Sequence, residues 1–473
     1  MSDDLSMMPA TELVALYRSG TVSPVEATRA ALDRIAEHNG VLNAFNVVLD
    51  DEAMAAARLS ESRWRKGEPI GLVDGVPTSI KDMVWMKGQP TRRGSLATPT
   101  TPESEDAPVV ARLREHGAVF LGKTTTPEFG WKGVTDSPLT GITRNPWDPS
   151  RTPGGSSGGA AAAVAVGMGA LAIGTDGGGS IRIPASLTGI FGIKPSAGAV
   201  PVYPPAGVGT LAAAGPMTRT VGDAALMMNV LARHDPRDWL SPPQAREDCL
   251  AHLDGGVRGL RIAVCPGLGY SEIDPDVTAR VREAAAVFAE LGARVEEVDR
   301  IIDSPRGFYE DYYRVAMAAS FRTMTPEQQA GTDPGFREMS EEGLKIGLFD
   351  YQRIEQSRAL LGAAVNAALE RHDLILTATL RVTAFEAGHE YPPGRGMRRW
   401  LDWCTTAYPF NMTGHPAASV PVGFGDNGMP VGLQIIGGRF TDALVLRAAR
   451  AYEQVHPFPM PALRTNRDEA RRA

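Results

Sequence analysis

The sequence has little cysteine, no long hydrophobic run and no block of charge of one sign. Its three cysteines, Cys249, Cys265 and Cys404, are widely spaced, which excludes both a disulfide framework and the clustered ligands of a zinc site. Each is therefore expected to be a small residue of the core. We expect neither a metal ion nor another cofactor.

The lack of long apolar and strongly charged segments also limits the partners. The longest uncharged apolar run, residues 160–173, is shorter than the roughly 20 residues that span a bilayer. The 48 basic and 55 acidic residues are interspersed, which does not favour binding to nucleic acid or to an anionic membrane. The first residues, MSDDLSMMPATEL, do not resemble a secretory signal. These features predict a soluble, cytoplasmic protein. We further expect a small-molecule substrate and a monomer or a homodimer.

Helical and strand patterns run through the chain without a repeat or an obvious linker. We therefore expect one large domain over residues 1–473, with an N-terminal helical segment at 10–67. A strand, a helix and a strand between residues 261 and 299 indicate a βαβ unit and a partly parallel sheet. Residues 303–395 are the least regular part. They are expected to form a helical insert that covers the functional site and shapes the choice of substrate, although a packed helical layer without such a role explains them equally well.

One segment matches a phosphate-binding loop in letters only. Residues 117–124 read GAVFLGKT and fit GxxxxGK[ST]. Such a loop requires a strand before its first glycine and a helix after it. Here a helical pattern precedes Gly117, the inner residues are strand-like, and Pro127 follows. The sequence therefore does not predict nucleotide binding.

Residues 152–184, TPGGSSGGAAAAVAVGMGALAIGTDGGGSIRIP, stand out from the rest of the chain. Two serines lie among glycines, Ser156 in GGSSGG and Ser180 in DGGGSIR, and the apolar run 160–173 separates them. Glycine clusters let the backbone approach a ligand closely. We expect the apolar run to be one buried element that holds the two serines at a fixed separation.

Two serine mechanisms compete on the residues alone. Residues 154–158 match the G-x-S-x-G nucleophile elbow, which would make Ser156 the nucleophile with a later aspartate and histidine. The elbow follows a strand, however, and the preceding NPWDPSRTP contains three prolines, which do not suit a central strand. His415 is the one histidine in a suitable glycine and proline context, and we interpret it as a packed, hydrogen-bonded residue.

In the second mechanism Ser180 is the nucleophile. The N–H groups of Gly177, Gly178 and Gly179 would form an oxyanion hole, and Lys81, at the end of a buried strand, would be the base acting through Ser156. That role requires a neutral lysine, and lowering its pKa from ~10.4 to near 7 demands roughly 4–5 kcal/mol of differential destabilisation. A buried amine in an apolar pocket reaches that value.

The sequence as a whole resembles the amidase signature enzymes. The resemblance is carried by GVPTSIKD (75–82), TPGGSSGG (152–159) and TDGGGSIRIPASLTGIFGIKPS (175–196), and it extends to TGHPAASVP and MPVGLQIIG near the end of the chain. Only residues from about 300 to 395 fall outside it. The resemblance implies an α/β fold, an α/β/α sandwich around a large mixed, mostly parallel sheet.

The resemblance also implies a role for each residue of the site. Ser180 attacks the carbonyl and forms an acyl-enzyme, and Ser156, on a cis peptide bond to Gly155, passes protons between Ser180 and Lys81. The remaining implied roles are an oxyanion hole at Gly177, Gly178, Gly179 and Ser180, a supporting ion pair between Asp176 and Arg182, and a further hydrogen bond from Ser157.

Three positions depart from the family pattern. Ala199 stands where the family often has an arginine, Thr377-Ala378-Thr379 replaces a threonine-proline-threonine, and Thr125 occupies a position often filled by asparagine. None belongs to the Ser180, Ser156 and Lys81 set. We expect them to influence the substrate pocket.

The function expected from these features is hydrolysis of an amide of a small molecule, with ester or carbamate hydrolysis through the same acyl-enzyme as a further possibility. Aromatic residues at Phe308, Tyr309, Tyr312 and Tyr313 favour bulky or aryl substrates. One alternative is the glutaminase-type subunit of a tRNA-dependent amidotransferase, which needs partner chains. Another is a nucleotide-binding protein, which the failed match at residues 117–124 argues against.

Overall fold

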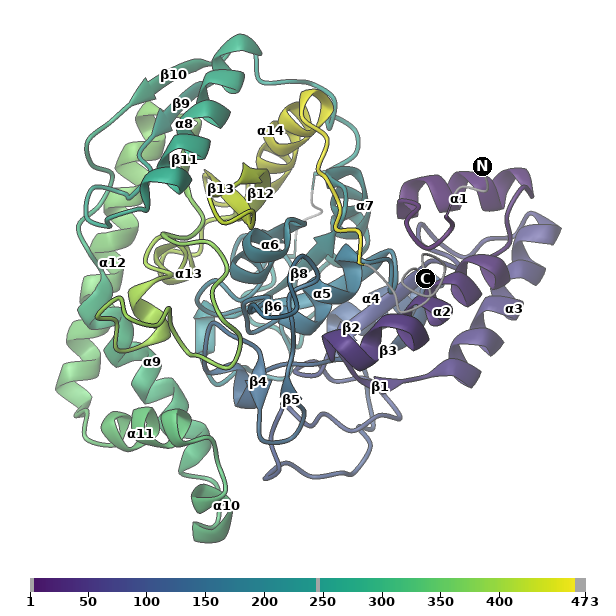
Figure 1. Cartoon of the computed structure of the whole chain (residues 1–473), viewed down its shortest axis with the longest axis horizontal. Coiled ribbons are helices and arrows are strands. Elements are labelled where there is room, and N and C mark those ends of the chain that lie inside the picture. The colour runs from purple at the N-terminus through teal and green to yellow at the C-terminus, as the bar shows by residue number, and fades with distance from the viewer. Residues whose placement is uncertain (1–3, 244–246, 464–473) are drawn as a thin grey trace, which may run out of the picture.

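The computed structural model describes residues 4–243 and 247–463. Within them a mixed sheet of eleven strands crosses the molecule (Figure 1). In spatial order its strands are β1 Phe45–Val48, β3 Val119–Thr124, β2 Pro77–Lys81, β6 Leu171–Asp176, β8 Ala213–Thr218, β7 Phe191–Lys194, β12 Ala417–Phe424, β13 Pro430–Gly437, β11 Leu374–Ala378, β9 Arg261–Val264 and β10 Arg294–Glu297. A separate pair is formed by β4 Asp136–Ser137 and β5 Gly141–Ile142.

Helices cover both faces of this sheet. The α-helices of the described residues are α1 Ala10–Ser19, α2 Pro24–Leu42, α3 Asp50–Lys66, α4 Pro108–Glu115, α5 Gly158–Ala165, α6 Arg182–Thr188, α7 Val221–Leu231, α8 Pro275–Glu290, α9 Arg306–Phe321, α10 Pro326–Ala330, α11 Pro334–Gly343, α12 Leu348–Arg371, α13 Pro409–Met412 and α14 Asp442–Val455. Alternate residues of one strand enter different clusters: Leu374 and Leu376 pack with α7, α8 and α14, whereas Ile375 packs with α9 and α12. The expected α/β/α sandwich is confirmed.

The directions of the strands refine that expectation. Among the pairs that the described residues form in the large sheet, four are parallel, namely β2 with β3, β2 with β6, β9 with β10 and β9 with β11. The other six are antiparallel. The sheet is mixed, as predicted, but it has fewer parallel pairs than the resemblance implied. The βαβ unit made by β9, α8 and β10 is confirmed.

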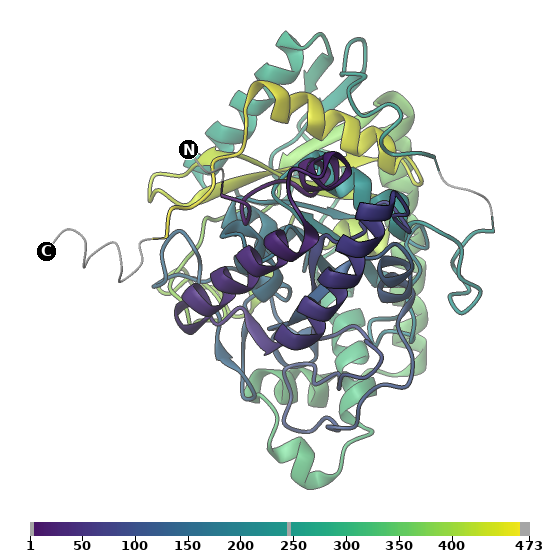
Figure 2. The same ribbon diagram turned by 90° about the vertical axis from the view of Figure 1, so that its right-hand side faces the viewer.

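The N-terminal helices form where the sequence has start and stop signals. Ser23 accepts a hydrogen bond from the Glu26 N–H, and the Glu26 side chain accepts one from the Ser23 N–H, so α2 begins with a complete capping box. Gly67 ends α3 in the left-handed conformation at φ 72°. Figure 2 brings α1, α2 and α3 to the front, where they cover one end of the sheet.

The apolar run 160–173 is buried throughout, but it is two elements, not the single element expected. Its first part belongs to α5, and its last part begins β6, with a turn between them. Alanine and glycine permit both a helix and a close-packed strand, and the turn between them contains Gly167 and Gly169, which have φ of 79° and 114°. The serines therefore lie at the starts of two neighbouring helical segments.

Residues 303–395 contain α9, α10, α11 and α12, which Figure 1 shows in green along one side of the molecule. The helical part ends at Arg371. The next residues form β11, which pairs with β13 and β9 inside the sheet. The predicted insert is therefore helical only as far as Arg371, Leu374–Ala378 belongs to the common sheet, and residues 379–395 are turns and irregular loop.

The phosphate-loop interpretation fails, as expected from the sequence. Strand β3 runs through Gly122, Lys123 and Thr124, and the Lys123 Nζ is buried, 3.2 Å from an Asp82 carboxylate oxygen.

All three cysteines are buried, and burial raises the pKa of each thiol. In the described residues no helix is long and apolar enough to cross a membrane.

Candidate active site

Lys81 lies at the carboxyl end of β2, beside the carboxyl end of the parallel strand β6. Ligand sites of α/β sheets commonly form where parallel strands end. The Lys81 Nζ lies 2.6 Å from Ser156 Oγ, 2.9 Å from Ser157 Oγ and 2.9 Å from Thr175 Oγ1. The lysine thus reaches three hydroxyl groups from two other elements.

The environment of Lys81 favours its neutral form. The side chain is 0% exposed, and burial lowers its pKa from 10.5 to about 7, although the Asp176 charge opposes this shift. Near neutral pH a large fraction of the amine therefore carries a lone pair. A group with that property can accept a proton from a hydroxyl group.

The two serines of the glycine-rich segments lie on one cavity. Ser156 and Ser157 precede α5, the peptide bond between Gly155 and Ser156 is cis, and Ser180 precedes α6. The Ser157 N–H donates to the Ser180 carbonyl oxygen at 3.2 Å, which joins the two segments. Ser156 and Ser180 both line a cavity of about 130 Å³. The structure thus brings Lys81, Ser156 and Ser180 to one place.

The glycines before Ser180 are sterically required. A Cβ on Gly178 would lie 1.9 Å from the Tyr309 Oη, and one on Gly177 would lie 2.9 Å from Val208. Gly179 has φ of 122°, and its N–H donates to an Asp176 carboxylate oxygen at 2.6 Å. The loop can therefore pass closely under α9 only because these residues lack side chains.

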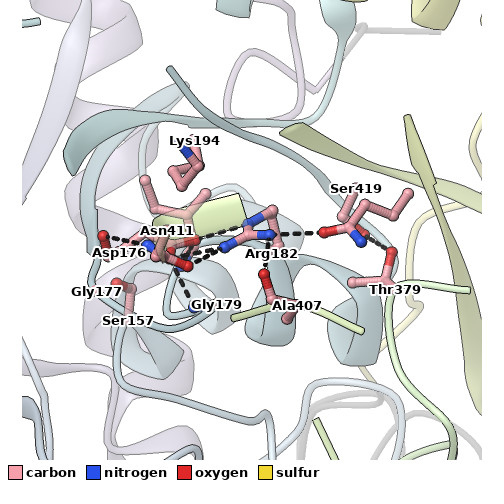
Figure 3. A network of polar contacts seen from close by, with 12 residues as sticks. Ser157, Asp176, Gly177, Gly179, Arg182, Lys194, Thr379, Ala407, Asn411 and Ser419 are labelled. Carbon is pink, nitrogen blue, oxygen red and sulfur yellow. Dashed lines mark hydrogen bonds and ion pairs between the residues drawn. The ribbon is translucent and has the colours of Figure 1, made fainter. Parts of the chain in front are cut away.

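Asp176 and Arg182 form the buried ion pair that the resemblance implied. Both are buried, and the Arg182 Nε and Nη2 lie 3.0 Å from the two carboxylate oxygens (Figure 3). Burial alone would raise the pKa of Asp176, but Arg182 and a hydrogen bond from Asn411 hold it well below its ordinary value. Arg182 also donates to Ala407 O at 2.6 Å and to Gln434 Oε1 at 2.7 Å. The pair ties the Ser180 loop to the C-terminal third of the chain.

Three contacts of the site were not predicted from the sequence, although Tyr309 was named there as part of an aromatic segment. Thr175 accepts from Lys81, Asn411 donates to Asp176 at 2.9 Å, and Tyr309 donates from α9 to Gly177 O at 3.3 Å. Thr175 directly precedes Asp176 in the quoted segment, so its position was a usable signal. Asn411 and Tyr309 are more than 100 residues from Ser180 in the chain, and no local pattern connects them with it.

His415 and the three departures from the family pattern lie apart from the cavity. His415 is fully buried, its ring nitrogens contact Thr413 Oγ1 and Asn366 Oδ1, and burial lowers its pKa to about 4. The interpretation as a packed residue is confirmed. Ala199, Ala378 and Thr125 are buried and are not among the residues that line the cavity, so the expected influence on its wall is not direct.

The cavity wall is largely apolar and aromatic. Its larger side chains include Trp85, Phe129, Tyr203, Tyr313 and Met317, and the last two come from α9. Helix α9 therefore forms part of the cavity wall. In the described parts of the chain no group of three or more histidine, cysteine, aspartate or glutamate side chains is placed to hold a metal ion.

The chain is similar to known proteins over most of its length. Residues 26–446 match the family model described as Amidase. The chain is 38% identical to an acylamidase of Rhodococcus erythropolis, over 96% of this chain and 97% of that protein. It is also 38% identical to a glutamyl-tRNA(Gln) amidotransferase subunit of Chloroflexus aggregans, over 92% of this chain and 94% of that one.

A solved structure of a bacterial aryl acylamidase of the amidase signature family superimposes with a TM-score of 0.89. It is 33% identical, and the match covers 95% of this chain and 96% of that one. A family match over most of the chain, relatives of nearly equal length and a shared fold lead to one assignment. The chain belongs to the amidase signature family and is a hydrolase that acts on amide carbon–nitrogen bonds.

Proposed function

We propose that the chain hydrolyses amides through a seryl acyl-enzyme, with Ser180 as nucleophile, Ser156 as proton relay and Lys81 as base. The observation that carries this proposal is the 2.6 Å contact between the buried Lys81 Nζ and Ser156 Oγ, in a cavity that Ser180 also lines. A lysine with a pKa of about 7 is matched to general-base work at neutral pH. Serine and lysine pairs are a known form of activated nucleophile.

The proton path follows from the order of the groups. The Ser180 Oγ forms a bond to the substrate carbonyl carbon and gives its proton to Ser156, whose own proton passes to Lys81. When the carbon–nitrogen bond breaks, the Lys81 ammonium returns a proton by the same path to the leaving nitrogen. Water then attacks the acyl carbon with the same base, and the carboxylic acid leaves as Ser180 regains its proton.

The set of N–H groups that we propose for the oxyanion hole is smaller than the set that the resemblance implied. Because the Gly179 N–H already donates to Asp176, we propose that the N–H groups of Gly177, Gly178 and Ser180 bind the developing negative charge. Gly179 then serves the geometry of the loop. Ser157, which also contacts Lys81, would orient the amine toward Ser156.

The substrates that suit this cavity have an apolar or aromatic frame. Trp85, Phe129, Tyr203 and Tyr313 supply flat apolar surface, which supports aryl amides, with aryl esters and carbamates as further substrates of the same acyl-enzyme. The similarity to an acylamidase and to an aryl acylamidase supports the same substrate class.

The test uses Ser180→Ala, Lys81→Ala and Ser157→Ala with p-nitroanilides and short aliphatic amides. We expect mass spectrometry to detect an acyl adduct on the wild-type chain and none on Ser180→Ala, and Lys81→Ala to be folded but nearly inactive. Ser157→Ala, which leaves the Lys81–Ser156 contact in place, should lose less activity. Most activity remaining in Lys81→Ala at neutral pH would refute the base assignment, and strict preference for small aliphatic amides would refute the aryl assignment.

The second candidate is a glutaminase subunit of a tRNA-dependent amidotransferase. It is supported by the 38% identity to the amidotransferase subunit of Chloroflexus aggregans. Ammonia release from glutamine, measured with and without the other chains of such a complex, separates the two. Glutamine hydrolysis that depends on those chains, with no turnover of anilides by this chain alone, would favour this candidate.

A further inference from the structure

Arg93 places a cation on the wall of the proposed active-site cavity. It lies in the loop between β2 and α4, and it lines the cavity together with Ser156, Ser180 and the apolar side chains. Asp176, the other charged residue of the lining, is already neutralised by Arg182. Among the described residues that line the cavity, Arg93 is the only cation.

The backbone at Arg93 is held in an unusual conformation. Its φ is 51°, a left-handed value that residues with a Cβ adopt only at an energetic cost. The Arg93 N–H donates to Asp82 O at 2.9 Å, and its carbonyl accepts from the Phe129 N–H at 2.7 Å. Phe129, also a lining residue, has the same φ of 51°. Two hydrogen bonds thus fix Arg93 between the end of the Lys81 strand and the cavity.

The Arg93 side chain has no partner of its own within residues 4–243 and 247–463: no ion pair or side-chain hydrogen bond is made by its guanidinium. Asp82 and Glu103 act on it only at longer range, and burial lowers the pKa of Arg93. The Asp82 carboxylate is engaged by Lys123 at 3.2 Å and by Asn46 at 2.5 Å. A partly buried guanidinium without a counterion is costly unless an anion binds it.

The neighbouring arginine is arranged differently. The Arg92 guanidinium donates to Thr98 Oγ1 at 3.3 Å and to Ser95 O at 3.4 Å, so it closes its own loop. Arg92 does not line the cavity. The two adjacent arginines therefore carry the same charge, but of the two only Arg93 lines the cavity. This makes Arg92 a matched control.

We propose that Arg93 binds a carboxylate of the substrate, so that the enzyme prefers amides that carry a carboxylate on an apolar or aromatic frame. A guanidinium fits a carboxylate with two parallel hydrogen bonds, which a neutral substrate does not supply. This inference rests on the proposed function, because the cavity is a substrate site only if Ser180 reacts there.

The test compares matched amides that differ only in charge. One pair is the p-nitroanilide of butanoic acid and the mono-p-nitroanilide of succinic acid, and the other is butanoyl anilide and 3-(butanoylamino)benzoate. The pairs place the carboxylate on the acyl side and on the leaving-group side. We expect the wild-type kcat/KM to favour the carboxylate in at least one pair, and Arg93→Met to lower that ratio about 10- to 100-fold. Arg93→Lys should retain part of it.

Controls separate a binding role from a structural one. Arg92→Met should keep the wild-type ratio and the wild-type turnover. The Ser180→Ala variant should bind the amide without cleaving it, so calorimetry can measure the binding of the amide that carries a carboxylate. Adding Arg93→Met to Ser180→Ala should weaken this binding by the same factor as it lowers the kcat/KM ratio.

The outcomes distinguish this inference from the function beneath it. An equal loss of kcat/KM for both members of each pair in Arg93→Met, or no preference for the carboxylate in either wild-type pair, overturns the role of Arg93 and leaves the acyl-enzyme intact. Absence of any acyl adduct and of turnover in the wild-type chain overturns the proposed function, and the inference with it.

Discussion

Replacing Lys81 with methionine should abolish catalysis and, at the same time, remove a pH-dependent cost in stability. In the folded chain burial lowers the pKa of Lys81 from 10.5 to about 7, whereas in the unfolded chain the amine keeps its ordinary value. That difference corresponds to about 5 kcal/mol of penalty when the amine enters the fold as a cation. Methionine has a similar length and no charge, so it escapes this penalty.

The sign of the effect follows from proton binding. Between pH 7 and about 10 the unfolded chain binds more protons at this position than the folded chain, so the free energy of unfolding of the wild type rises with pH relative to Lys81→Met. From pH 7 to pH 9 this difference should change by about 2 kcal/mol. The three hydrogen bonds lost with the amine shift the difference at every pH but leave its slope unchanged.

The assay is denaturant unfolding of both chains at several pH values, alongside kcat/KM. Lys194→Met is the matched control, since burial also lowers the pKa of Lys194 to about 7, but its Nζ donates to Pro195 O and not to a serine. It should reproduce the stability slope and keep measurable turnover. If the difference in the free energy of unfolding between the wild type and Lys81→Met does not depend on pH, Lys81 is not neutral in the folded chain. A wild-type kcat/KM that does not rise as the pH increases through about 7 would independently contradict a neutral Lys81.

Three other changes test the parts of the site. Arg182→Met leaves the buried Asp176 carboxylate without its cation and should cost about 3–5 kcal/mol in the free energy of unfolding, measured by denaturation; a loss under about 1 kcal/mol would contradict the bracing role. Gly178→Ala should lower kcat at least tenfold because its Cβ would meet the Tyr309 Oη, and the added Tyr309→Phe change should restore part of the loss; no rescue means that the contact is not the cause. Ser156→Ala should lower kcat by about 10²–10⁴-fold, the range for a lost proton-transfer group, with little change in melting temperature. A single-turnover rate of the Ser156→Ala variant equal to that of the wild type would exclude a relay.

Local signals predicted most of the elements because each signal acts over a few residues. The capping box at Ser23, the left-handed glycine at Gly67 and the strand pattern before Lys81 all depend on neighbours within one or two turns. The run 160–173 misled because alanine, glycine and valine suit a buried helix and a buried strand alike. Hydrophobic periodicity has no contrast in such a run, so only packing decides where α5 ends and β6 begins.

The residues of the site also fall into two groups, those that a local pattern marks and those that only tertiary contacts bring to the site. Lys81, Ser156 and Ser180 were proposed because glycine clusters mark the two serines and the family resemblance marks all three. The partners that complete their surroundings, Asn411 and Tyr309, come from elements far along the chain, and their roles follow from tertiary contacts that no local pattern encodes. The sequence therefore does not predict which residues from distant elements contact the site.

A shifted pKa does not by itself single out Lys81 as the proposed base, because Lys81 and Lys194 are both buried and both have a pKa of about 7. What separates them is the atom that each amine meets: a carbonyl oxygen at Lys194 has no proton to give, whereas a hydroxyl group at Lys81 has one. The Asp176 charge acts against burial at Lys81 and favours the ammonium. Burial outweighs the attraction of that carboxylate, which is itself paired with Arg182 and hydrogen-bonded by Asn411, and burial thereby favours the neutral amine that the proposed base requires.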